Sequence, residues 1–229
     1  MKRRGPEEYE RLMRAVLLLS MVVSICFIVR GGARMVSSGQ VKVEKRQERP
    51  CVVIDDGSLE KDINLVIAQK LQKFLQLQDV EAILTRESDA GLYDENASNK
   101  KVQDMKNRVA LIEERQPALT VSIHQNSYHE EYVHGAQVFY YANSEKSKTL
   151  AEQIQQAMAL ELDKENARQA KANDSYYLLK KTSTPIVIVE CGFLSNYEEA
   201  QKLSSDLYQE KVAWAIHMAI MQYLNHEDK

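Results

Sequence analysis

Apolar and polar positions follow two alternating periods from about residue 50 to the C-terminal end. Short apolar runs rich in β-branched residues are typical of buried strands. Longer stretches with an apolar residue every three or four positions are typical of amphipathic helices, as for Ile63, Ile67, Leu71 and Leu75. The pattern predicts strands at 51–55, 80–85, 118–123, 136–141 and 186–189, and helices at 61–78, 99–114, 148–162 and 208–224.

Strands that alternate with helices predict an α/β fold. The expected architecture is a three-layer sandwich, in which a mostly parallel central sheet is flanked by helices. Ligands of such folds bind beyond the carboxyl ends of the strands. That rule singles out residues 55–60, 124–126 and 190–191, because each group directly follows a predicted strand.

The N-terminal part of the chain differs, because a basic head precedes an uncharged apolar run at 15–29. Fifteen helical residues rise about 22 Å, which is less than the hydrocarbon core of about 30 Å. Residues 1–30 therefore predict a signal peptide or a short signal-anchor helix, with a buried helix of a soluble domain as the alternative. A signal segment makes the membrane a partner and places the following domain outside the cytoplasm, on the cell-wall side.

Charge separates the same two parts of the chain. Residues 1–49 carry eleven Lys/Arg and five Asp/Glu, whereas residues 50–229 carry nineteen and twenty-eight. A basic head on an acidic domain favours targeting, so no nucleic acid is expected as a partner. Residues 31–49 are polar and include several Gly and Ser, which predicts a linker to one domain at 50–229. The three scattered cysteines exclude a disulfide framework.

Three residues at these strand ends are candidates for chemistry. His124 is placed as a zinc ligand would be, although a structural or exposed histidine is the commoner alternative. Glu190 could take a proton from a bound water and return it to a leaving amine, and an ion pair with Lys or Arg is its alternative role. Glu60 opens a predicted helix, where the helix dipole alone accounts for a carboxylate.

Three motifs occur in the order found in zinc-dependent N-acetylmuramoyl-L-alanine amidases. They are LEKDINL at 59–65, SIHQN at 122–126 and VECGFLSN at 189–196. Over roughly residues 51–225 the chain resembles this family. Within the family it is similar to the spore-cortex members, on the segments GAQVFYY at 135–141, SYYLL at 175–179 and YQEKVA at 208–213.

The resemblance implies an amidase/phosphorylase-like fold with one Zn²⁺ site. Glu60 and His124 would be zinc ligands, Glu190 the general base and then the general acid, and Asn126 a substrate-binding residue. The bond cut would be the amide between the lactyl group of muramic acid and L-alanine in peptidoglycan, whose glycan strands with stem peptides would be the substrate. In the spore cortex this reaction prepares the formation of muramic lactam by another enzyme.

One zinc ligand of the family pattern is missing. The family has a His in an Asp-x-Gly-His-Gly-Gly loop after the first strand, whereas here only residues 56–59 separate Asp55 from Glu60. We therefore expect weakened zinc binding. The chain is an inactive, deleted form, or an accessory protein or self-association completes the site, or another side chain substitutes. The candidate substitutes are Asp55, Asp56, His129 and His134.

Two functions from different classes are therefore compared. The first is an exported, zinc-dependent peptidoglycan amidase of the spore cortex, impaired by the missing histidine. The second is a non-catalytic peptidoglycan-binding or regulatory protein on an amidase fold. Loss of stem-peptide release on substitution of Glu190 distinguishes the first from the second.

Overall fold

The computed structural model describes residues 49–56, 61–88 and 90–227. The predicted signal segment, almost all of the predicted linker and Glu60 lie outside these residues. None of the helices in the described part is both long and apolar enough to cross a membrane.

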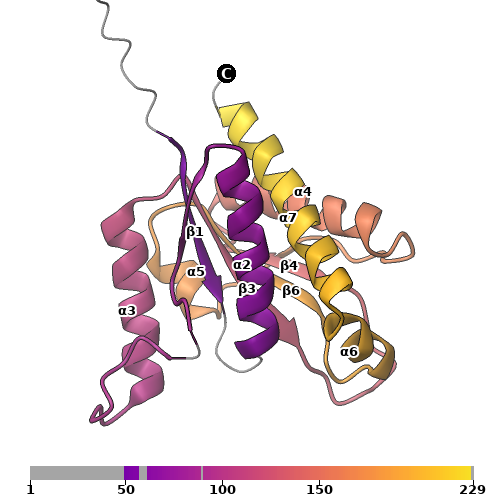
Figure 1. The fold of residues 1–229 in the computed structure, drawn as a ribbon, viewed down its shortest axis with the longest axis horizontal. Helices are drawn as coiled ribbons and strands as arrows, with labels where there is room; N and C mark the ends of the chain where they lie inside the picture. Colours follow the sequence, from indigo (N-terminus) through magenta and orange to yellow (C-terminus); the bar gives the residue numbers. More distant parts are fainter. Residues whose placement is uncertain (1–48, 57–60, 89, 228–229) are drawn as a thin grey trace, which may run out of the picture. The chain divides into compact units, whose positions relative to one another are not determined.

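The described residues form a six-stranded sheet in the order β2-β1-β3-β6-β4-β5. Every neighbouring pair is parallel except β4 and β6, which are antiparallel. The mostly parallel α/β architecture predicted from the sequence is thus confirmed (Figure 1). The elements in chain order are β1 Cys51–Asp56, α2 Lys61–Leu77, β2 Glu81–Leu84, α3 Lys100–Arg115, β3 Leu119–Asn126, β4 Gln137–Tyr140, α4 Glu145–Glu161, β5 Lys171–Ala172, α5 Tyr177–Lys181, β6 Ile186–Phe193, α6 Tyr197–Leu203 and α7 Asp206–Glu227.

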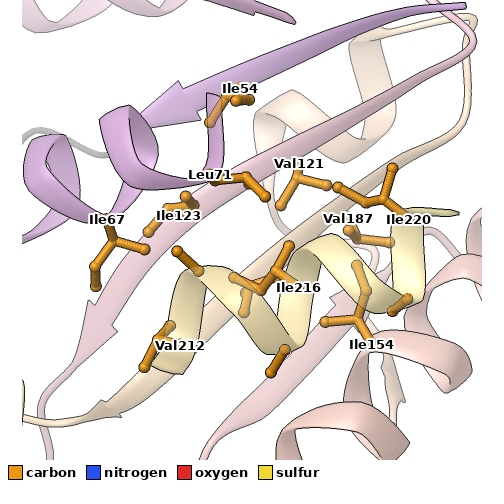
Figure 2. Packing of buried hydrophobic residues seen from close by; sticks show 14 of the residues in the cluster. Ile54, Ile67, Leu71, Val121, Ile123, Ile154, Val187, Val212, Ile216 and Ile220 are labelled. Atoms are coloured by element: carbon orange, nitrogen blue, oxygen red, sulfur yellow. The ribbon is translucent and has the colours of Figure 1, made fainter. Parts of the chain in front are cut away.

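The helices cover both faces of the sheet and make the three layers (Figure 1). Helices α2, α4 and α7 lie on one face, above the larger apolar core. Figure 2 shows Ile216 and Ile220 of α7 among the side chains that pack with Val121 and Val187 of the sheet. Helices α3 and α5 lie on the other face, where a smaller apolar cluster includes Ile188.

Two predicted strand ends were wrong in a way that matters for the site. Residues 124–126 and 190–191 do not follow their strands, because β3 continues to Asn126 and β6 to Phe193. Every residue of β6 is buried, including the polar Glu190. The strand therefore continues beyond its apolar run at 186–189. Strand β5 and the short helices α5 and α6 were not predicted.

His217 of α7 is a buried imidazole in the helical layer. It is 4% exposed, its ring lies 5.7 Å from that of Phe74 and 5.2 Å from that of Trp214, and neither ring nitrogen has a hydrogen-bond partner among the described residues. Burial holds the pKa of His217 below its ordinary value. The unfolded chain therefore binds a proton more readily than the folded chain, and stability falls as pH drops through the ordinary histidine range.

We expect His217→Leu to raise the melting temperature by about 2–4 °C at pH 7.5, because an unsatisfied buried polar group is removed. The gain should be larger at pH 5.5. At this pH the unfolded wild-type chain protonates His217, whereas the folded chain keeps the buried ring neutral, and this difference lowers the stability of the wild type. Thermal unfolding of both proteins at the two pH values measures this, with the exposed His226 of the same helix replaced by leucine as control. Equal gains at both pH values would contradict a role for protonation.

Candidate active site

The alternation of side chains along the strands brings polar residues to one face of the sheet. In β3, Val121 and Ile123 enter the larger core, so Ser122 and His124 lie on the opposite face, toward α3 and α5. Strand register places Asp55 of β1 beside Ser122, and Glu190 of β6 beside His124. The register of β3 and β6 shifts directly after this last pair, as is common next to active sites.

These side chains share a cavity of about 90 Å³ between the sheet and helices α3 and α5. Its walls are formed by Asp55, Met105, Arg108, His124, Tyr176, Tyr177, Leu178, Ile188 and Glu190.

A chain of hydrogen bonds connects helix α3 to the His124 ring. Arg108 Nη1 donates to Asp55 Oδ1 at 2.5 Å, and Ser122 Oγ donates to Asp55 Oδ2 at 2.5 Å. His124 Nε2 lies 3.0 Å from Ser122 Oγ. Arg108 is itself held by Asp104, whose Oδ2 accepts from its Nε at 2.8 Å. The position of the imidazole is thus tied to a buried ion-pair network.

Asp55 is fully engaged by this network. Besides Arg108 and Ser122, its Oδ1 also accepts from Thr85 Oγ1 at 2.9 Å. Burial disfavours the charged carboxylate, but the Arg108 charge and the Ser122 hydrogen bond outweigh it and hold the pKa of Asp55 below its usual range. Both oxygens of Asp55 therefore serve protein partners, and the carboxylate is poorly placed to replace a lost metal ligand.

The other candidate substitutes are no better placed. Asp56 Oδ2 pairs with Arg86 Nε at 2.7 Å, and burial raises the pKa of Asp56 to about 6. His129 and His134 are exposed and do not line the cavity. In the part of the chain that the structure describes, no group of three or more His, Cys, Asp or Glu side chains is arranged to hold a metal ion. The zinc ligands that the sequence resemblance implies, Glu60 and His124, therefore stay a prediction.

The two central groups differ in what they can do. Burial lowers the pKa of His124, so the ring is neutral near pH 7 and keeps one nitrogen lone pair. Glu190 is 7% exposed and lies near the Tyr176 hydroxyl, whose pKa is raised by burial and by the Glu190 carboxylate. The His124 ring offers a nitrogen lone pair, and the Glu190 carboxylate beside it can accept a proton. Such a pair is suited to proton transfer during hydrolysis of a bond.

Two further residues of the motifs are not part of this cavity. Asn126 ends β3, where its Oδ1 accepts from the backbone N–H of Ser127 at 2.8 Å, so its role toward substrate stays a prediction. Cys191 is buried on the other face, and burial strongly raises the pKa of its thiol, which excludes a thiolate nucleophile there.

Arg108, Ser122 and Tyr176 belong to the site but were missed as functional residues. Asp104 and Arg108 have the i,i+4 spacing of a helical ion pair, which was the signal available for the arginine. Ser122 stands two residues before His124, so strand alternation places it on the same face. Tyr176 lies in the SYYLL segment at 175–179, so the resemblance to the spore-cortex members was the signal available for it.

An α/β sheet with a buried carboxylate and a neutral imidazole side by side defines a candidate hydrolase. Residues 45–222 match the sequence model of a protein family described as N-acetylmuramoyl-L-alanine amidase. The chain therefore belongs to the N-acetylmuramoyl-L-alanine amidase family and is a hydrolase of that class.

Individual relatives agree with this family. The germination-specific N-acetylmuramoyl-L-alanine amidase of Bacillus subtilis is 36% identical over 172 residues, which cover 74% of this chain and 72% of the relative. The amidase LytC of the same species is 31% identical, but the match covers only 32% of its length.

Solved structures show the same fold. The CwlD amidase of Clostridioides difficile, determined in complex with the GerS lipoprotein, is 36% identical and superposes with a TM-score of 0.73 over 77% of this chain and 99% of that one. The amidase AmiC2 of Nostoc punctiforme is 30% identical, with a TM-score of 0.65 over 77% of this chain and 97% of that one.

Proposed function

We propose that this chain hydrolyses the amide between the lactyl group of muramic acid and L-alanine in the peptidoglycan of the spore cortex. The observation that carries the proposal is the register pair of His124 and Glu190, which lines one cavity in a chain that matches the amidase family. The cortex as substrate is supported by similarity to a germination-specific amidase. Preparation of the cortex for muramic-lactam formation is the step that such cleavage would serve.

In this reaction Glu190 would take a proton from the attacking water and return it to the leaving amine of L-alanine. The Tyr176 side chain lines the same cavity as Glu190. His124 offers a neutral ring nitrogen at the same cavity.

The proposal includes one zinc ion, bound more weakly than in a site with all the ligands of the family pattern. His124 would hold the ion through a ring nitrogen and Glu60 through its carboxylate. When bound, zinc polarises an amide carbonyl and lowers the pKa of a bound water. An accessory protein or self-association is the proposed source of the remaining donor, in line with the CwlD relative, which was solved with a lipoprotein partner.

The metal prediction is that release of stem peptides rises with added Zn²⁺ and is lost after treatment with a chelator. Purified full-length protein is incubated with cortex peptidoglycan at increasing zinc concentrations, and peptides with a free N-terminal L-alanine are quantified by mass spectrometry. Zinc bound per chain is measured in parallel by elemental analysis, and we expect less than one ion per chain. Undiminished release in the chelator would contradict the zinc part of the proposal.

A second function, binding of peptidoglycan without cleavage, is favoured by the ion pairs of Asp55 and Asp56. Because Asp55 and Asp56 are committed to Arg108 and Arg86, neither offers an obvious replacement for the missing histidine. The chain would then bind peptidoglycan without cutting it. Co-sedimentation with peptidoglycan but no peptide release at any zinc concentration would favour this alternative. Action outside the cytoplasm, through an N-terminal signal peptide or membrane anchor, belongs to both proposals.

A further inference from the structure

The Ser122 hydroxyl lies between two partners and has one proton to give. Its Oγ is 2.5 Å from Asp55 Oδ2 and 3.0 Å from His124 Nε2. A serine hydroxyl donates one hydrogen bond and accepts others through its lone pairs. The directions of the two bonds therefore depend on which partner is unable to donate.

Asp55 is the partner that is unable to donate. Its Oδ1 accepts from Arg108 Nη1 at 2.5 Å and from Thr85 Oγ1 at 2.9 Å, and the whole residue is 1% exposed. A carboxylate in contact with a buried guanidinium is ionised, and an ionised carboxylate only accepts hydrogen bonds. The Ser122 proton therefore points to Asp55 Oδ2, and only a lone pair of Ser122 Oγ remains for His124.

We propose that Ser122, oriented by Asp55 and Arg108, is a positioning residue that fixes the ring proton of His124 on Nε2. A neutral imidazole has one ring proton, so Nδ1 becomes the nitrogen that can bind a metal ion or accept a proton. Ser122 acts through His124 and has no contact of its own with a reacting group in this scheme. Its importance for turnover rests on the proposed function, whereas the position of the ring proton does not.

Nuclear magnetic resonance of the full-length protein tests the proton position directly. With ¹⁵N-labelled histidine, couplings between ring nitrogens and ring carbon protons distinguish the two tautomers, and His124→Gln identifies the His124 signals among the five histidines. At pH 7.5 we expect a single tautomer with a directly detected proton on Nε2, protected from solvent exchange by its bond to Ser122. A proton on Nδ1, or a mixture of tautomers, in the wild-type protein would overturn the proposal.

Variants of β3 test the role of the hydroxyl. In Ser122→Ala we expect the protected Nε2 proton signal to be lost and both tautomers to be present, whereas Ser122→Thr, which keeps a hydroxyl, restores the single tautomer. Thr120→Val is the matched control, because Thr120 is buried on the same face of the same strand and its hydroxyl has no partner among the described residues. An unchanged Nε2 signal in folded Ser122→Ala would refute the proposal.

Turnover separates this inference from the proposed function. If the chain is an amidase, Ser122→Ala lowers kcat for peptide release at least about tenfold with little change in KM, because orientation at the reacting bond is lost. A wild-type protein that shows the Nε2 proton but releases no peptide would sink the proposed function alone. A wild-type protein that releases peptide with the proton on Nδ1 would sink the inference alone.

Discussion

Replacing Glu190 with glutamine is expected to lower amide hydrolysis by about 10²–10⁴-fold, the usual contribution of a positioned general acid–base group. Glutamine has nearly the same shape and keeps an amide oxygen that can accept hydrogen bonds in place of a carboxylate oxygen. It is unable to take a proton from water, however, so it cannot return one to the leaving amine. The loss should appear in kcat, with KM nearly unchanged.

The measurement is the rate at which peptides with a free N-terminal L-alanine leave cortex peptidoglycan. Glu131→Gln serves as the matched control, because Glu131 is exposed in the loop after β3 and does not line the cavity. The melting temperature of the Glu190 variant should stay within a few degrees of the wild-type value. A Glu190→Gln protein that keeps wild-type release would remove Glu190 from the chemistry and leave the amidase proposal without its base.

The fold was predictable because both periods of the hydrophobic pattern are clear. The apolar runs at 51–55 and 186–189 lie in strands that are buried on both faces, and Ile63, Ile67, Leu71 and Leu75 lie on the buried side of α2. The end of β6 was not predictable from this pattern. It continues through Glu190, which is buried on the face toward α3 and α5 beside a cavity with polar walls, and sequence periodicity does not distinguish such a position from a solvent-exposed strand end.

The site was only partly predictable for the same reason. Motifs and strand ends singled out His124 and Glu190, and the structure places them side by side, although their roles stay predictions. Asp55 was considered a substitute metal ligand, whereas the structure places it against a buried arginine. Arg108 lies in a helix rich in charged residues, where an Asp104–Arg108 spacing is typical of an exposed pair. Only the packing of α3 on β1 shows that this pair is buried.

The burial of Arg108 predicts the second large effect, a loss of stability of about 3–5 kcal/mol in Arg108→Met, as is usual when one partner of a buried ion pair is removed. Arg108 is 2% exposed and bonds to Asp55 at 2.5 Å and to Asp104 at 2.8 Å. Its Nη1 also donates to the backbone oxygen of Asp56 at 2.6 Å. The methionine would fill much of the same volume but would leave two buried carboxylates without a counter-charge.

Urea unfolding of wild-type and variant protein at several pH values measures this loss and its origin. In the wild type, the lowered pKa of Asp55 means that its contribution is present above the ordinary aspartate pKa and is lost as pH falls through the folded value. In Arg108→Met, Asp55 has no guanidinium to keep it ionised. Protonation of Asp55 at low pH therefore removes the unfavourable free energy of a buried, unpaired carboxylate. The difference in stability should therefore shrink between pH 7 and pH 4.

Lys100→Met is the matched control on the same helix, because Lys100 bonds to Glu95 at 2.7 Å in an exposed pair. We expect only a small change in its unfolding midpoint, since solvent already screens that pair. Arg108→Met should also disturb His124, because Asp55 no longer holds Ser122 in one orientation, so the protected Nε2 proton should be lost with the stability. Equal midpoints for the two variants would mean that the network is not buried in solution, and the ordered chain from Arg108 to His124 would then have no physical basis.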